Sequence, residues 1–258
     1  DNLAVTGAAA TVTVAVTGGT ANAADRNLTG TITIPAGTAH NALVSIASGI
    51  TVTGDSVFEN DDTLQLTLTA PVSAVLGAQS TLTHTIVNDD TAPTLAINDV
   101  SVVEGNAGNT FMNFTVTRTG LTDLNAAFTA SSADGTATLA DADYLALNLV
   151  FSVAAGGASN TATVTVVVNG DVQAESNEQL VVNLTAPSNA TVSDAQGVGT
   201  ITNDDAAPVL YINDVSITEG NAATSTLTFT VTRTGATASA VGFNFASVDN
   251  AATIIDNE

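Results

Sequence analysis

Apolar and polar side chains alternate along several stretches of the chain with a period of two. The apolar positions that carry this alternation are Leu64, Leu66 and Leu68, then Met112, Phe114 and Val116, then Leu180, Val182 and Leu184. Threonine and other polar residues fill most of the positions between them. This period is typical of β-strands that turn one face to a core and the other to water. No stretch shows a convincing amphipathic helical pattern, so the sequence predicts an all-β protein.

The chain also repeats itself. The segment 95–106, which reads Leu-Ala-Ile-Asn-Asp-Val-Ser-Val-Val-Glu-Gly-Asn, returns at 210–221 as Leu-Tyr-Ile-Asn-Asp-Val-Ser-Ile-Thr-Glu-Gly-Asn, a step of 115 residues. The Asn-Asp-Asp of 88–90 returns at 203–205 with the same step. Gly54, Asp55 and Glu59 return as Gly170, Asp171 and Glu175 with a step of 116, which indicates one small insertion. Repetition at a fixed period indicates a tandem array of one structural unit.

The repeats divide the chain into three segments. Residues 91–205 form a complete unit, residues 1–90 form a unit that lacks its opening strands, and residues 206–258 form the opening half of a third. Short linkers with a proline stand at both boundaries. Short strands separated by turn residues favour, for each unit, an immunoglobulin-like antiparallel β-sandwich of roughly 100 residues. We expect the sandwiches to follow one another as a rod, and the chain to be a window onto a longer polypeptide.

The composition excludes several classes of function. Lys and Arg number 3 against 25 Asp and Glu, a net charge of -22, which excludes binding to nucleic acid or to an anionic membrane surface. No run of about 18 apolar residues occurs, so we expect no membrane insertion. Cysteine and catalytic motifs such as Gly-x-Ser-x-Gly are absent, so we expect no enzyme. Arg118 and Arg233 each end a strand, and we expect each to pair with a local acid.

The acidic residues gather in a few turns instead of spreading over the strands. In the complete unit they include Asp99, Glu104, Asp134, Asp141, Asp143, Asp171, Glu175, Glu178, Asp204 and Asp205. Loops that are distant in sequence meet at one end of a Greek-key sandwich, where carboxylates without Lys or Arg repel one another. A hard cation removes this repulsion, and Ca²⁺ accepts roughly 6–8 oxygen ligands from flexible loops. The alternative is that these acids only form turns and keep the protein soluble.

Four motifs in order carry a resemblance to a known family. They are Ile-Asn-Asp-Val-Ser-x-x-Glu-Gly-Asn at 97–106, Asp-Gly-Thr-Ala at 134–137, Asn-Gly-Asp-x-x-x-Glu-x-Asn-Glu at 169–178, and Ile-Thr-Asn-Asp-Asp at 201–205. Together they resemble the Calx-β domain, a family that includes regulatory calcium-binding domains of sodium/calcium exchangers and tandem arrays in bacterial surface proteins. The resemblance covers the complete unit and extends into both flanking segments.

The resemblance implies a set of calcium ligands. In the complete unit these are Glu104, Asp134, Asp171, Glu175, Asp204 and Asp205. In the first segment they are Asp55, Glu59, Asp89 and Asp90, with Asp62 standing where the complete unit has Glu178, and in the third segment they are Glu219 and Asp249. The acidic runs are thinner than those of the exchanger domains and read Asn-Gly-Asp and Asn-Asp-Asp. Fewer carboxylates imply fewer ions or weaker binding.

The function that we expect is structural. Repeats, calcium sites and a cysteine-free composition favour an extracellular segment of a bacterial cell-surface protein, such as an adhesin stalk or the shaft of a surface appendage, stiffened by Ca²⁺. The expected partners are neighbouring repeats of the same polypeptide, identical chains in a filament or oligomer, and an unknown surface ligand. Two alternatives stay open. One is a subunit that builds a filament through its incomplete ends, and the other is a calcium-sensing regulatory module.

Overall fold

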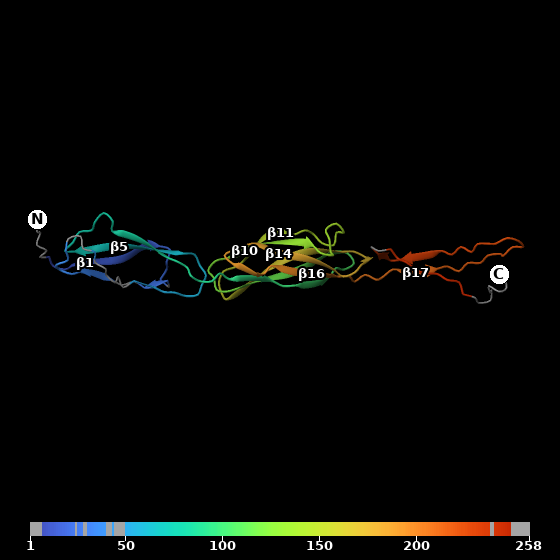
Figure 1. Cartoon of the computed structure of the whole chain (residues 1–258), viewed down its shortest axis with the longest axis horizontal. Coiled ribbons are helices and arrows are strands. Elements are labelled where there is room, and N and C mark those ends of the chain that lie inside the picture. The colour runs from blue at the N-terminus through green and yellow to red at the C-terminus, as the bar shows by residue number, and fades with distance from the viewer. Residues whose placement is uncertain are drawn as a thin grey trace.

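The structure of the chain is a computed structural model, which describes residues 7–23, 25–27, 30–39, 43, 50–237 and 240–248. All regular secondary structure in these residues is β-strand, so the prediction of an all-β protein is confirmed. Within the same ranges, no helix is long and apolar enough to cross a membrane. Figure 1 shows the three segments one after another along the longest axis, with the complete repeat in the middle.

The complete repeat is a sandwich of two sheets. One sheet has the strand order β11 (Asn148–Val153), β10 (Ala126–Asp134), β14 (Glu178–Ser188), β16 (Gln196–Thr202) and β8 (Val100–Val103). The other sheet has the order β12 (Ser159–Gly170), β9 (Gly108–Thr119), β7 (Thr94–Ile97) and β15 (Thr191–Asp194). The predicted β-sandwich is therefore present, and four strands of its first sheet are labelled in the centre of Figure 1.

The core of this sandwich consists of the apolar positions of the period-two pattern. Met112 and Phe114 of β9 have no exposed surface, and neither has Leu180 of β14 in the other sheet. A glycine of β16 lets the sheets approach closely, since a Cβ on Gly199 would lie 2.3 Å from Met112 Sδ. Burial of each large apolar side chain contributes about 1.5–3 kcal/mol. The alternation seen in the sequence is therefore what holds the two sheets together.

The repeated Ile-Asn-Asp-Val motif marks the place where the chain passes from one sheet to the other. β7 and β8 are separated only by Asn98 and Asp99. Asn98 Oδ1 accepts a hydrogen bond from Thr115 N at 2.5 Å, and Asp99 Oδ1 accepts one from Val198 N at 2.7 Å. This crossing places β7 parallel to β15 and β8 parallel to β16. The sheets are therefore mixed at these two pairs, whereas the sequence predicts an antiparallel sandwich.

Arg118, at the end of β9, is completely buried. Its guanidinium donates hydrogen bonds to the carbonyl oxygens of Gly120, Gly156 (2.6 Å) and Gly157 (3.3 Å). The expectation that Arg118 pairs with an acid was wrong, because two glycine turns direct their main-chain oxygens at the guanidinium. The arginine thus ties the turn after β9 to the turn before β12.

The described part of the first segment contains a four-stranded sheet and a short strand pair. The sheet has the order β3 (Thr31–Ile34), β1 (Ala10–Gly19), β5 (Asp62–Val72) and β6 (Thr81–Ile86), and the pair is β2 (Arg26–Asn27) with β4 (Thr51–Val52). This order corresponds to β11, β10, β14 and β16 of the complete repeat, and β5 begins 116 residues before β14. The first segment therefore supplies the counterpart of one sheet of the sandwich.

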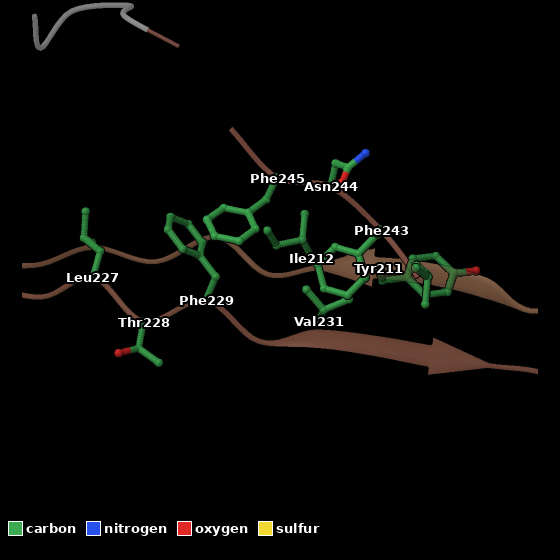
Figure 2. A pocket seen from close by; sticks show the side chains of 10 residues that line it. Tyr211, Ile212, Leu227, Thr228, Phe229, Val231, Phe243, Asn244 and Phe245 are labelled. Atoms are coloured by element: carbon green, nitrogen blue, oxygen red, sulfur yellow. The ribbon is translucent and has the colours of Figure 1, made fainter. Parts of the chain in front are cut away.

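The third segment exposes the face that forms the core in the complete repeat. Its β17 (Val209–Ile212) pairs with β18 (Val231–Thr234) as β7 pairs with β9. Phe229, which stands 115 residues after the buried Phe114, is 52% exposed, and Phe243, 115 residues after Phe128, is 55% exposed. Figure 2 shows the Phe243 ring beside Tyr211 and the Phe229 ring beside Phe245, all lining one apolar groove. The groove is the uncovered core face of a repeat.

Candidate metal centre

Four loops of the complete repeat bring acidic residues together. Glu104 lies in the loop after β8, and Asp143 lies in the loop between β10 and β11. Asp171 and Glu175 lie in the connection from β12 to β14, and Glu178 is the first residue of β14. Asp204 and Asp205 lie in the loop after β16. The close approach of two of the loops requires glycine, because a Cβ on Gly170 would lie 2.1 Å from Gly105 O. Gly105 N in turn donates a hydrogen bond to Asp204 Oδ1 at 3.2 Å. Close backbone approach at Gly105 and Gly170 and the bond to Asp204 therefore bring three of the loops together.

Glu104, Asp204 and Asp205 form the first cluster, in which each carboxylate has an oxygen within 4.8 Å of the others. Glu104 is only 7% exposed, and its Oε1 is buried without a hydrogen-bond partner. Asp205 Oδ2 is also buried and unpaired. Such an atom costs about 1–3 kcal/mol, and more when it is charged. A cation bound between these carboxylates would satisfy both oxygens.

The first cluster is strongly electronegative. Burial, followed by the charges of Asp171, Glu175, Asp205 and Asp204, raises the pKa of Glu104 from 4.5 to about 7. Burial and the charges of Asp204 and Asp171 also raise the pKa of Asp205. At neutral pH Glu104 is therefore partly protonated. A divalent cation would displace this proton and remove the repulsion at the same time.

Asp143, Glu175 and Glu178 form the second cluster, again with oxygens within 4.8 Å of one another. Burial, followed by the charge of Asp143 and a hydrogen bond with it, raises the pKa of Glu178 to about 7. The charge of Glu175 acts on both Glu178 and Glu104. The two clusters therefore adjoin at Glu175 and form one acidic centre.

The first segment contains a matching cluster of Asp25, Glu59 and Asp62, whose oxygens also lie within 4.8 Å of one another. Glu59 and Asp62 stand 116 residues before the two glutamates of the second cluster. Burial and the charges of Asp25, Asp62, Asp55 and Asp123 raise the pKa of Glu59. The same arrangement of carboxylates thus occurs in two repeats whose sequences differ at most other positions.

The remaining ligands implied by the resemblance have different surroundings. In the first segment, burial and then the charges of Asp55 and Asp89 raise the pKa of Asp90, so these three carboxylates interact electrostatically. Glu219 of the third segment is exposed. Asp249 lies outside the described residues.

Asp134 is not a member of either acidic cluster in the described residues. Its Oδ1 accepts hydrogen bonds from Tyr144 OH at 2.6 Å and from Leu139 N at 3.1 Å. The position 116 residues earlier is Gly18, which has no carboxylate. Asp134 therefore organises the loop between β10 and β11, and Asp143 of the same loop is the residue that joins a cluster.

Four further carboxylates take part in the clusters although the resemblance did not imply them as ligands: Asp25, Asp62, Asp143 and Glu178. Asp62 and Glu178 hold the same repeat position, which is visible in the sequence as the step of 116 residues. Asp25 and Asp143 lie in loops of different length, so a fixed step does not pair them.

The donors of the centre are carboxylate oxygens, and neither His nor Cys takes part in the clusters found among the described residues. Such hard, flexible loop ligands fit Ca²⁺, which accepts about 6–8 oxygens. They do not fit Zn²⁺, which takes nitrogen and sulfur ligands in tetrahedral geometry. Asn203 supports the centre from outside, since its Oδ1 accepts a hydrogen bond from Glu175 N at 3.4 Å.

Comparisons with known proteins agree with this architecture. Residues 41–91 and 88–214 match the family model described as the Calx-beta domain. No curated protein matches the chain.

Several solved structures are similar to part of the chain. The apo form of the Calx CBD1 domain has 22% identity and a TM-score of 0.38, covering 45% of this chain and 100% of that one. CBD12 from CALX1.2 has 23% identity and a TM-score of 0.38, covering 50% of this chain and 53% of that one. The calcium-binding domain CBD12 of CALX1.1 has 23% identity and a TM-score of 0.38, covering 49% and 53%. The chain thus spans about half the length of the two CBD12 structures.

At these identities and TM-scores the solved structures add no argument of their own, and the assignment rests on the family model. Because its two matches together cover more than half of the sequence, the chain belongs to the Calx-beta domain family.

Proposed function

We propose that the chain is a non-enzymatic, calcium-binding structural segment of a larger extracellular protein on a bacterial surface. Glu104 Oε1 is the observation that carries the calcium part of this proposal. It is a carboxylate oxygen, it is buried without a partner, and its carboxylate lies within 4.8 Å of two others.

Glu104, Asp204 and Asp205 would hold calcium at the first cluster, with Asp171 beside them, and Asp143, Glu175 and Glu178 would hold it at the second. Further loop oxygens would complete each shell. The ion supplies charge neutralisation and no reaction chemistry. Flexible loop ligands of an extracellular module bind Ca²⁺ with a Kd of about 10⁻⁴–10⁻³ M, a range suited to external calcium. A regulatory sensor requires a Kd of about 10⁻⁷–10⁻⁵ M.

The structural role is supported by the repetition of the chain. Units that mainly contact their neighbours in sequence behave as a quasi-one-dimensional array, and such an array provides reach and stiffness. Absence of cysteine allows folding in any redox environment, and a net charge of -22 favours solubility outside the cell. An adhesin stalk or the shaft of a surface appendage fits these properties.

The test is calcium-dependent thermal stability of the whole chain, measured in calcium and in EGTA. Calcium at about 100 times its Kd should contribute about 2.7 kcal/mol per site, so EGTA should lower the Tm. The double variant Asp171→Ala/Asp205→Ala should lose this difference in the complete repeat. Asp194→Asn, on β15 outside both clusters, is the matched control and should keep it. An unchanged Tm in EGTA would refute the calcium proposal, and calorimetry would separate the structural segment from a sensor.

The uncovered face of the third segment supports a second candidate function, a filament subunit. In a filament, the third segment of one chain would pack against the sheet of the first segment of the next chain, a head-to-tail contact that leads to an open polymer. A clean exchange is disfavoured because β1 and the stretch 241–248 both correspond to β10, so the pair would contain this strand twice. Sedimentation of the 258-residue chain as long polymers would favour the filament.

A further inference from the structure

The first segment contacts the complete repeat through a short backbone bridge. Phe58 pairs in parallel with Thr122. Phe58 N donates a hydrogen bond to Leu121 O at 3.1 Å, and Asp123 N donates one to Phe58 O at 3.2 Å. Thr122 Oγ1 donates to the same carbonyl, Phe58 O, at 2.8 Å. One carbonyl of the first segment is thus held by two donors of the next repeat.

The second boundary contains the same bridge. β13 (Gln173–Ala174) pairs in parallel with β19 (Ala236–Thr237) of the third segment. Thr237 Oγ1 donates to Ala174 O at 3.3 Å. Ala174 stands 116 residues after Phe58, and Thr237 stands 115 residues after Thr122, so the contacting positions are those related by the repeat. Because the side chains at 58 and 174 differ completely, the contact is made by the backbone and the threonine.

The receiving side of the bridge is held in place within its own repeat. Thr122 is 1% exposed, its Oγ1 accepts a hydrogen bond from Leu124 N at 3.0 Å, and its carbonyl accepts one from Gly156 N at 2.8 Å. The linker Pro93 packs against Gly120, two residues before Thr122, since a Cβ on Gly120 would lie 3.0 Å from Pro93 Cα. At the second boundary a Cβ on Gly235 would lie 3.1 Å from Pro208 Cα.

The donating side is shaped by an aspartate turn at both boundaries. Asp55 Oδ1 accepts a hydrogen bond from Val57 N at 2.8 Å, and Asp171 Oδ1 accepts one from Gln173 N at 2.6 Å. This is an Asx-turn, and the bridging residues follow it directly, since β13 begins at Gln173 and Phe58 comes after Val57. The stretch that docks on the next repeat therefore begins within the acidic loop.

We propose that the two bridges are copies of one inter-repeat joint, a docking surface whose partner is the next repeat of the same chain. Its sequence signature is Arg-Thr-Gly-x-Thr, read at 118–122 and again at 233–237. The bonds of the joint join neutral backbone groups and a hydroxyl, so the joint sets the orientation of successive repeats without any ligand. It is separate from the calcium proposal, although Asp123 of the receiving loop adds its charge to the acidic environment of Glu59.

The absence of cysteine permits a direct cross-linking test on the whole chain. Residues opposite each other in a strand pair point to the same face, so Gln173→Cys with Ala236→Cys places two thiols together while Thr237 stays intact. The matched control is Val172→Cys with Ala236→Cys, one residue out of register. Mild oxidation should form the disulfide of the in-register pair at least about tenfold faster, because thiols that point apart cannot be bridged. The in-register pair should cross-link in EGTA as well as in calcium.

A second variant examines the first boundary independently. Thr122→Val should speed amide hydrogen exchange at Phe58 and Asp123, whereas Thr185→Val, exposed on β14, should leave both rates unchanged. Equal cross-linking of the in-register and control pairs, or cross-linking only in calcium, would overturn the joint. Loss of the calcium effect on Tm with normal cross-linking would instead contradict the calcium proposal alone.

Discussion

Replacing Glu104 by Gln should stabilise the calcium-free protein above neutral pH. The carboxyl has a pKa of about 7 in the folded chain against an ordinary value of 4.5. Because the folded state binds this proton more tightly than the unfolded state, its contribution to stability is present below pH 4.5 and is lost as the pH rises through 7. At pH 8 the difference amounts to at most about 3 kcal/mol, which Glu104→Gln should recover in part.

The effect should have a defined pH window and the opposite sign in calcium. A gain of about 3 kcal/mol corresponds to roughly 10 °C in Tm for a domain of this size. In EGTA, Glu104→Gln should raise the Tm at pH 8 and leave it nearly unchanged at pH 4.5. In saturating calcium the variant should lose stability relative to the parent, because an amide is a poorer ligand than a carboxylate.

Tyrosine provides the assay for this prediction. Tyr144 is buried in the complete repeat, and Tyr211 is the second of the two tyrosines in the chain. In a Tyr211→Phe background, near-ultraviolet circular dichroism therefore follows unfolding of the complete repeat alone. The matched control is Asp194→Asn, which removes a carboxylate of the same repeat outside both clusters and should not respond. A Tm of Glu104→Gln that falls at pH 8 in EGTA, or that changes equally at both pH values, would refute the reasoning.

Three further predictions concern protons, a turn and a buried cation. Calcium affinity measured by calorimetry should fall as the pH drops through 7, with proton release on binding, because two glutamates with a pKa of about 7 must ionise. Gly120→Ala should lower the free energy of unfolding, measured by chemical denaturation, by about 2 kcal/mol or more, because φ is +121° and Pro93 blocks the Cβ. Gly156→Ala should cost less, because its Cβ meets no atom within 4 Å. Arg118→Met should lower the free energy of unfolding by about 3 kcal/mol, because three carbonyls lose their donor. Arg233 is exposed, so Arg233→Met should cost little. Equal costs of the two variants would contradict the structure.

Much of the fold could be predicted from the sequence, because period-two alternation is a local property. Met112 and Phe114 are buried as the pattern predicts. The direction of pairing between β8 and β16 could not be predicted in this way, since it depends on where the chain crosses between sheets. The Asn-Asp pair at 98–99 is the local cause of that crossing, but its hydrogen bonds reach partners distant in sequence.

The acidic centre was predictable only in part. Its position in the loops followed from the resemblance and the repeat, but the choice between Asp134 and Asp143 did not. Asp134 ends β10 and Asp143 lies in the loop that follows, and only the fold shows that Asp134 bonds to Tyr144 while Asp143 joins Glu178. Arg118 was misjudged for a related reason, since carbonyl oxygens of glycine turns leave no charge pattern in a sequence.

The parallel pairing of β8 with β16 has a mechanical consequence. Its register joins Val100 to Gly199 and Val103 to Thr202, so the chain enters the pair at one end and leaves it at the other. Tension applied along the polypeptide therefore pulls the two strands past each other in shear, and the hydrogen bonds between them must break together instead of one by one. The same holds for β7 and β15 in the opposite sheet. Each complete repeat thus resists extension at the strands where load enters and leaves, and its resistance is governed by the unfolding rate under force.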